Sequence, residues 1–163
     1  MGYEEFIGKE NLKAEQLKQL ELFRLWASNS NWTAFHDNHY DWWSFPIDKP
    51  SQKGFRYSIS KEMREELKQD QGFINQLRES TVLLLLSWGW DAETSRPVAN
   101  AEPGQDWANW PVRLFKCNRS LKMFAQADLV ESSQKLAVNL RERGTSFKYR
   151  DKDLLPEILS SQL

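Results

Sequence analysis

Both histidines of the chain lie in one short segment, at His36 and His39, with Asp37 and Asp41 beside them. Imidazole nitrogens and carboxylate oxygens bind divalent metals, and a spacing of three residues would place both rings on one side of a helical turn. A structural Zn²⁺ site needs four ligands, however, and carboxylates would have to supply the rest. We therefore predict neither a metal nor another cofactor. We expect instead a histidine that bonds a backbone carbonyl and stacks on tryptophan, with His39 in the core and His36 exposed.

The segment that carries the histidines continues into Trp42 and Trp43 and ends at Pro46. Four further tryptophans follow in a later stretch of the chain: Trp88, Trp90, Trp107 and Trp110. Tryptophan is large and amphipathic and is enriched at binding hot spots, so these rings could form a platform for a base, a sugar or a peptide. The interpretation that we favour for most of them is that they fill the space between helices. Because neighbouring rings cannot all be buried equally, we expect one or two to be partly exposed.

Arg113 stands between two apolar residues, Val112 and Leu114, in a predicted helix. A guanidinium cannot lose its charge, so burial at this place requires a carboxylate or several carbonyl oxygens as partners. We predict a carboxylate partner, either Asp41 in the aromatic segment or Asp91. Such a pair would tie the aromatic segment to the helix and could serve as an anion site.

These residues support two hypotheses on function. The first is an intracellular binding or interaction domain with an aromatic-rich surface. The alternative is a small enzyme or ligand-binding domain with a Trp-lined pocket, in which His39, Asp41 and Arg113 supply the polar groups. Pocket depth and convergence of polar groups distinguish the two hypotheses. No catalytic nucleophile can be named. The candidate residues for binding a ligand or partner are His39, Asp41, Trp42, Trp43, Trp90, Trp110 and Arg113.

Composition narrows the classes of partner. The 163 residues include 22 basic and 23 acidic ones, so no global positive field favours nucleic acid, and we expect no nucleic-acid partner. The apolar run Val82–Leu86 is too short to cross a bilayer, and the first residues lack the features of a signal peptide. The single cysteine, Cys117, fits a reducing compartment and a core position. We expect a cytoplasmic protein with a protein or small-molecule partner, and a homo-oligomer is left open.

The apolar periodicity predicts an all-α fold. Helices are expected over residues 11–28, 61–70, 72–88, 111–124, 128–143 and 154–159. The aromatic-rich segment between the first two is expected to be irregular, residues 91–106 to form the main loop, and residues 148–153 to form a charged linker. We thus predict a single-domain helical bundle of five or six helices over residues 1–163, with its core in residues 11–144 and a C-terminal tail in residues 145–163.

Several helix ends have recognisable residues. Ser60 is a predicted N-cap, and Asp128 with Glu131 resembles a capping box. Gly89 and Gly144 stand where a helix ends in a residue of positive φ. In the first helix we expect Leu17 and Leu25 to widen the buried stripe, which is built on Leu12, Leu20 and Phe23.

Three pieces of the chain, Tyr40–Pro46, Ser80–Gly89 and Val112–Leu121, carry a resemblance to a known family. The first is similar to a His-x-Tyr-Ile-Gln-Trp-Leu-Phe-Pro motif, the second to an apolar helix that ends in a ring-Gly step, and the third to Leu-Arg-Ile-Thr-Arg-Ile-Leu-x-Ser-Leu. All three motifs belong to the conserved region of the opioid growth factor receptor family, which has bacterial members of unknown role.

The resemblance implies an all-α domain and brings no established activity. It also implies core positions for Trp43 and Phe45. At Arg113, the family's motif likewise has an arginine among apolar residues. Two departures lie in or beside the first piece, because the family's histidine falls at Asn38 and Ser44 replaces an apolar residue. The resemblance therefore bears on the fold more than on the function.

Overall fold

The computed structural model describes residues 2–163 and is predominantly helical, which confirms the predicted all-α class. The residues described form eight α-helices: α1 (Lys9–Ser28), α2 (Trp32–Asp37), α3 (Asp41–Ser44), α4 (Lys61–Lys68), α5 (Gln71–Ser87), α6 (Pro111–Met123), α7 (Ala127–Glu142) and α8 (Leu155–Leu159). A short 3₁₀ turn, η1 (Tyr3–Glu5), precedes them. Two antiparallel hairpins pair β1 (Trp90–Asp91) with β2 (Arg96–Pro97) and β3 (Lys148–Tyr149) with β4 (Lys152–Asp153).

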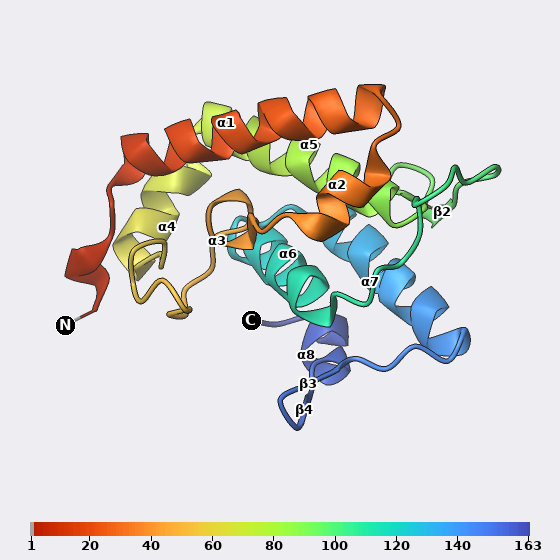
Figure 1. Cartoon of the computed structure of the whole chain (residues 1–163). Coiled ribbons are helices and arrows are strands. Elements are labelled where there is room, and N and C mark those ends of the chain that lie inside the picture. The colour runs from red at the N-terminus through yellow and green to blue at the C-terminus, as the bar shows by residue number, and fades with distance from the viewer. Residues whose placement is uncertain (1) are drawn as a thin grey trace.

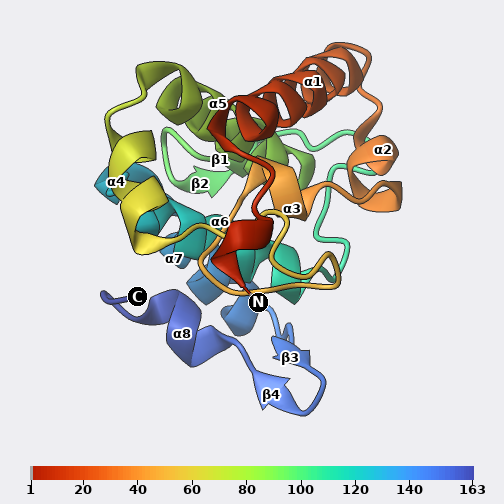
Figure 2. The same ribbon diagram turned by 90° about the vertical axis from the view of Figure 1, so that its left-hand side faces the viewer.

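The long helices form two packed pairs, α1 with α5 and α6 with α7 (Figures 1 and 2). α2 and α3 lie between α1 and α6, and α8 covers α6 and α7. The hairpin β3–β4 projects beside α8 and close to the start of α6. The aromatic segment is therefore held between both helix pairs.

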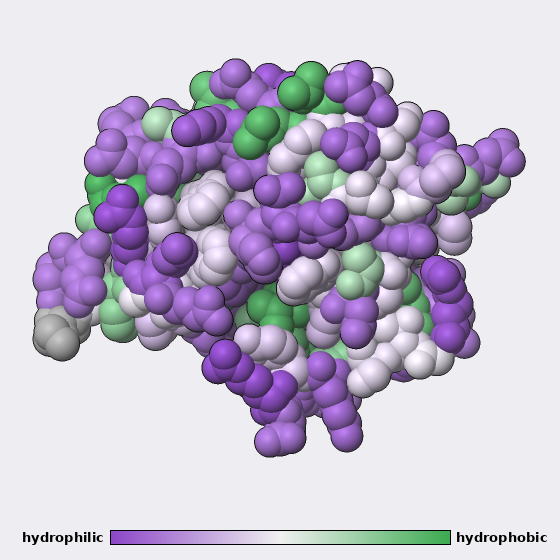
Figure 3. Space-filling model, viewed as in Figure 1, coloured by the Kyte–Doolittle hydropathy of each residue, from purple (hydrophilic) through white to green (hydrophobic). Residues whose placement is uncertain are grey.

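α1 buries a narrower stripe than its sequence predicts. Leu12, Leu20 and Phe23 are fully buried against the core, as expected. Leu17 and Leu25, predicted to widen the stripe, are instead 38% and 54% exposed. The physical reason is that α1 lies at the edge of the molecule with one neighbouring face, so residues away from that face meet solvent. Apolar patches lie among hydrophilic residues along the upper edge of the surface, over α1 (Figure 3).

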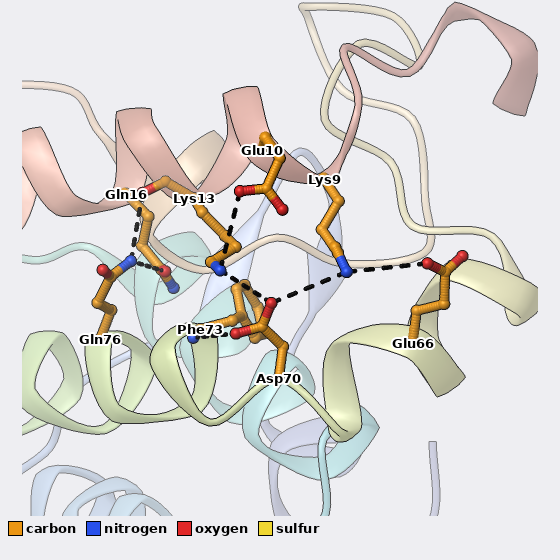
Figure 4. A network of polar contacts seen from close by, with 8 residues as sticks. All are labelled: Lys9, Glu10, Lys13, Gln16, Glu66, Asp70, Phe73 and Gln76. Atoms are coloured by element: carbon orange, nitrogen blue, oxygen red, sulfur yellow. Dashed lines mark hydrogen bonds and ion pairs between the residues drawn. The ribbon is translucent and has the colours of Figure 1, made fainter.

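A polar network fixes α1 to the start of α5 (Figure 4). The carboxylate of Asp70 caps α5 by accepting a hydrogen bond from the Phe73 N–H at 3.1 Å, and it pairs with the Lys13 ammonium at 2.9 Å. The hydrogen bond from Lys13 lowers the pKa of Asp70 below its usual value. Further along, the Gln76 amide donates to the carbonyl of Lys13 and to Gln16. α1 is thus bound to α5 both at the N-cap of α5 and one turn further along that helix.

The other helix ends agree in part with the caps predicted from the sequence. Ser60 accepts a hydrogen bond from the Met63 N–H, which confirms the predicted N-cap of α4. Gly89 and Gly144 have positive φ as expected, and a Cβ at Gly89 would lie 3.0 Å from the Gln105 carbonyl oxygen. The predicted capping box is wrong. α7 begins at Ala127, so Asp128 lies inside the helix.

Asp128 bonds across to α5 instead. Its carboxylate accepts two hydrogen bonds from Arg78, at 2.9 and 2.6 Å. This contact lowers the pKa of Asp128 to about 2. The capping prediction fails because a guanidinium on the neighbouring helix binds the carboxylate more strongly than a backbone N–H would.

We expect the Arg78–Asp128 pair to make stability pH-dependent. Because the folded-state pKa of Asp128 is lowered, the pair stabilises the fold above the unfolded-state pKa near 3.8, and the contribution is lost as the pH falls through about 2. The carboxylate side chain is 64% exposed, so solvent screening limits the effect to less than about 1 kcal/mol. Chemical denaturation of the wild type and Asp128→Asn should show this difference at neutral pH and none near pH 2. A difference that persists near pH 2 would contradict the assignment.

The segment predicted to be irregular contains two short helices, of six and four residues, and the predicted charged linker is a hairpin. α2 and α3 account for the helix count above the expected five or six. In the hairpin β3–β4, Arg150 and Asp151 occupy the turn and both have positive φ, as a two-residue type I′ turn requires. Arginine is not a usual choice for the first place of such a turn, and the second place lacks the usual glycine, which is why the sequence did not predict it.

Cys117 is fully buried, as predicted. Burial raises the pKa of its thiol to about 12, and the thiol lies 3.7 Å from the Thr81 hydroxyl oxygen. It therefore behaves as a small core residue. None of the helices formed by residues 2–163 combines the length and apolar character needed to cross a lipid bilayer.

Candidate functional site

An open groove of about 1170 Å³ runs between the aromatic segment, the start of α6 and the hairpin β3–β4. We call it the aromatic groove, and it is lined by residues 39, 41–43, 50–53, 109–113, 116 and 148–150. It includes six of the seven residues predicted from the sequence: His39, Asp41, Trp42, Trp43, Trp110 and Arg113. On the face shown in Figure 3, near-neutral and apolar residues lie among hydrophilic ones over α6, and the hairpin below them is mostly hydrophilic.

The tryptophans of the groove are half-buried. The rings of Trp42 and Trp43 lie 5.6 Å apart, and the Trp43 indole N–H donates to the Gln19 side-chain oxygen at 3.2 Å. His39 lies between two rings, 6.2 Å from Trp42 and 5.8 Å from Trp110. The rings therefore support one another from one side while part of each indole stays open to the groove. Partial exposure was expected, and Trp43, for which the resemblance implied a core position, is half-buried and packs against the core.

Arg113 lies at the floor of the groove and is 2% exposed. Its guanidinium donates to the carbonyl oxygen of Phe35 at 2.7 Å, to the Tyr40 hydroxyl at 3.0 Å and to the carbonyl oxygen of Asn38. The ring centroids of Trp110 and Tyr40 lie 3.9 and 4.6 Å from the guanidinium carbon. Carbonyl dipoles and π faces thus stabilise this buried cation.

The predicted carboxylate partners of Arg113 are wrong. Asp41 pairs with the Lys116 ammonium at 2.7 Å, one helical turn further along α6. Asp91 accepts hydrogen bonds from the Glu93 and Thr94 N–H groups in its own turn. The aromatic segment leaves the helix α2 at Asp37, which turns two carbonyl groups toward α6, and these satisfy the guanidinium without a carboxylate.

The next turn of α6 also binds the stretch that follows the aromatic segment. The Arg119 guanidinium binds the Asp48 carboxylate through two hydrogen bonds of 2.8 and 2.9 Å. Burial alone would raise the pKa of Asp48, but the adjacent Arg119 guanidinium holds that pKa below its usual value. Together, Arg113, Lys116 and Arg119 hold the backbone that carries the tryptophans. The groove therefore has a rigid wall.

The opposite rim carries cations that sequence reasoning missed. Lys53, Lys148 and Arg150 are exposed and line the groove. The Lys53 ammonium lies 5.1 Å from the Trp42 ring centroid, and the Lys116 ammonium lies 5.6 Å from it. No local signal could have linked Lys148 and Arg150 to the tryptophans, because about a hundred residues separate them from Trp42 and Trp43 and about forty from Trp110. Only the docking of the hairpin beside α6 brings them together.

The two histidines do not occupy the places that their sequence context predicts. His36 is half-buried, and its Nε2 lies 2.7 Å from the Gly104 carbonyl oxygen. Since a carbonyl only accepts, Nε2 carries the proton. His39 is exposed, which reverses the expectation of a core His39 and an exposed His36. α2 ends at Asp37, so the helical turn that a shared metal would need is not formed.

Metal binding is testable directly. Residues 2–163 contain no cluster of three or more His, Cys, Asp or Glu side chains suited to a metal ion. We expect a chelator such as EDTA to leave the thermal midpoint unchanged, because a metal that binds only the folded state would raise it by mass action. A drop on adding the chelator that is absent in His39→Ala would overturn this prediction.

Trp90 is the candidate that the structure places elsewhere. It is 3% exposed, and its indole N–H donates to the Ser132 hydroxyl at 3.1 Å. Trp88 and Trp107 pack edge to face nearby, with centroids 4.8 Å apart. This part of the aromatic content fills the space between α5 and α7, and it does not contact the groove.

A second hollow, of about 660 Å³, lies between α5 and α7 and contains none of the candidate residues. Its charged lining includes Arg78, Glu79 and Asp128, which are engaged in ion pairs within the chain. The aromatic groove is therefore the better candidate site, since its rings and its rim cations are open to a ligand.

No family model matches the chain, and no curated protein or solved structure is significantly similar to it. Membership in the opioid growth factor receptor conserved-region family consequently stays a prediction. Functional inference has to come from the groove itself.

Proposed function

We propose that this chain is a binding domain whose ligand or partner occupies the aromatic groove. The observation that carries the proposal is the convergence of three half-buried tryptophans, Trp42, Trp43 and Trp110, on one open cavity. Folding normally covers such rings, and large exposed aromatic area in a concave site is typical of ligand binding. The wall behind the rings is fixed by Arg113, so the cavity is formed before a ligand arrives.

The enzyme hypothesis is less well supported by the same geometry. Of its three proposed polar groups, Arg113 is saturated by acceptors of the chain and Asp41 is bound by Lys116. His39 alone of the three is free to act on a bound molecule, and the hydroxyl groups of the residues that line the groove are those of Ser51 and Tyr149. Binding requires none of these groups to be released, whereas catalysis by all three would break the contacts that hold the wall.

A thermal-shift screen against small molecules of different charge tests the proposal. A ligand of the folded state raises the thermal midpoint by mass action. We expect hits whose shift is lost in Trp42→Ala and kept in Trp26→Ala, a matched half-buried tryptophan on α1 outside the groove. Each variant is compared with its own unliganded midpoint. Hits that persist in Trp42→Ala would place binding elsewhere and contradict the proposal.

A further inference from the structure

We infer that the aromatic groove takes a phosphorylated planar ring compound of mononucleotide size. This inference rests on the proposed function and specifies the class of ligand. Three features of the groove carry it: a local excess of positive charge, a buried cation and helix N-terminus at its floor, and open indole rings.

The charge of the groove is opposite to that of the chain. Its lining holds five cations, Lys53, Arg113, Lys116, Lys148 and Arg150, against one carboxylate, Asp41, which gives a net charge of +4 with His39 neutral. The whole chain carries −1. Cations gathered in a cleft of low-dielectric walls raise the local concentration of an anionic ligand.

The rim cations are also available. No ion pair among residues 2–163 engages the side chain of Lys53, Lys148 or Arg150, whereas the lysines and arginines on α1 and α5 mostly have carboxylate partners. The contacts shown for two of them are with aromatic rings, Lys53 over Trp42 and Arg150 over Tyr149. Three unpaired cations around one cleft form a set of donors for phosphate oxygens.

The floor of the groove adds fixed positive potential. α6 begins there at Pro111 without a side-chain cap. The Arg113 and Leu114 N–H groups donate to the Trp110 carbonyl oxygen, so the Val112 N–H and the partial positive charge of the helix end remain at the groove. Arg113 in the same turn brings a full charge that is 98% buried and has no carboxylate partner. Its N–H groups are engaged by acceptors of the chain, but no carboxylate neutralises its charge, so Arg113 adds positive potential at the floor of the groove without contacting a ligand itself.

The rings of the groove suit a planar group. Trp42, Trp110 and Tyr149 line it together, and Tyr149 is 41% exposed. Stacking of a base on an aromatic side chain contributes about 1–3 kcal/mol and accepts any planar heterocycle. Phosphate alone would leave these rings unused, and an uncharged ring would leave the cations unused. A ring and a phosphate in one molecule satisfy both.

The size of the groove favours a small molecule over a polymer. Its volume of about 1170 Å³ is close to the range of small-molecule sites. Single-stranded nucleic acid would need a charged track beyond the cavity, and the net charge of −1 on the chain opposes that. We therefore assign a mononucleotide-like ligand and treat an oligonucleotide as an outcome that the test must be able to reveal.

Calorimetric titration tests the assignment with four probes: the ribonucleoside 5′-monophosphates, the matching nucleosides, inorganic phosphate and a single-stranded decanucleotide. We expect at least one monophosphate to bind at concentrations up to about 1 mM, at least tenfold more tightly than its nucleoside or inorganic phosphate. Raising the salt concentration should weaken this binding because the rim charges are exposed.

Variants locate the contacts. Lys148→Ala/Arg150→Ala should weaken binding of the monophosphate at least tenfold, and Trp42→Ala should do the same, while Lys18→Ala, an exposed lysine on α1 outside the groove, should change nothing. The hairpin residues are exposed, so the double variant is expected to keep the thermal midpoint of the wild type.

Four results would overturn the inference: a nucleoside that binds as tightly as its monophosphate, inorganic phosphate that does so, a decanucleotide that binds more than tenfold more tightly per site, or no binding of any monophosphate. These results are distinguishable from failure of the proposed function. Thermal-shift hits that depend on Trp42 but are uncharged or cationic would keep the binding domain and reject the phosphorylated ligand.

Discussion

Replacing Arg113 by methionine is expected to lower the free energy of unfolding by about 3 kcal/mol. Methionine is apolar and roughly fills the volume of the side chain, but it donates no hydrogen bond. The Phe35 carbonyl would keep only the Tyr40 hydroxyl as a donor, and the part-buried Asn38 carbonyl would lose the donor that holds it. A lost hydrogen bond to a charged group costs about 1.5–3 kcal/mol, and relief of the buried charge offsets part of that loss.

Two further variants separate this account from the carboxylate pairing expected from the sequence. Arg113→Lys keeps the charge but cannot reach three acceptors at once, so we expect it to recover only a small part of the lost stability. In a double-mutant cycle, Arg113→Met and Asp41→Asn should have additive effects on denaturant unfolding, because Asp41 pairs with Lys116. A loss below about 1 kcal/mol in Arg113→Met, or strong coupling to Asp41, would contradict the observed partners.

Phe45→Ala is expected to lower the free energy of unfolding by about 3–5 kcal/mol, the usual cost of removing a fully buried ring. Phe45 is 0% exposed and follows α3 directly. Trp43→Ala should cost about half as much, because one side of its ring is open to the groove. The resemblance to a known family implied equal core positions for the two rings, and the structure separates them.

Urea denaturation of both variants, with the m-value used to confirm two-state unfolding, measures this difference. Trp43→Phe is the matched control, since it keeps the contact with the Tyr57 ring at 5.5 Å but loses the hydrogen bond to Gln19. If Trp43→Ala costs as much as Phe45→Ala, the tryptophan belongs to the core and the groove loses one of its rings.

The long helices were predictable because their physics is local. Apolar spacing, the Ser60 cap and the proline at the first turn of α6 each act within a few residues. The two short helices of the aromatic segment were not predictable in this way. α3 has four residues and depends on Phe45 and Asp41 being held by neighbouring elements, which no local pattern encodes.

The sequence indicated most of the residues that line the candidate site, but it did not indicate which groups they bond to. The cluster of histidine and tryptophan in one segment indicated His39, Trp42 and Trp43, because unusual ring content in a short stretch requires a structural or binding role. Arg113 was correctly predicted to be buried, but its partners are backbone carbonyls. Every residue carries a backbone carbonyl, so the sequence cannot indicate which carbonyl will face a given side chain.

The position of the rim cations could not be predicted from the sequence for another reason. Lys148 and Arg150 reach the tryptophans through a hairpin turn formed by Arg150 and Asp151, which both have positive φ and lack the glycine that such turns usually carry. Without that hairpin the same residues form an ordinary charged stretch. The local excess of positive charge therefore exists only in the folded chain.

¹⁹F NMR of the protein labelled with 5-fluorotryptophan, resonances assigned by single Trp→Phe variants, tests the central claim most directly. When a ligand found by thermal shift is added, we expect the resonances of Trp42, Trp43 and Trp110 to move and those of Trp88 and Trp90 to stay in place, because the first three line the groove and the last two are buried elsewhere. Binding that leaves all three groove resonances unchanged would contradict the claim that the aromatic groove is the binding site.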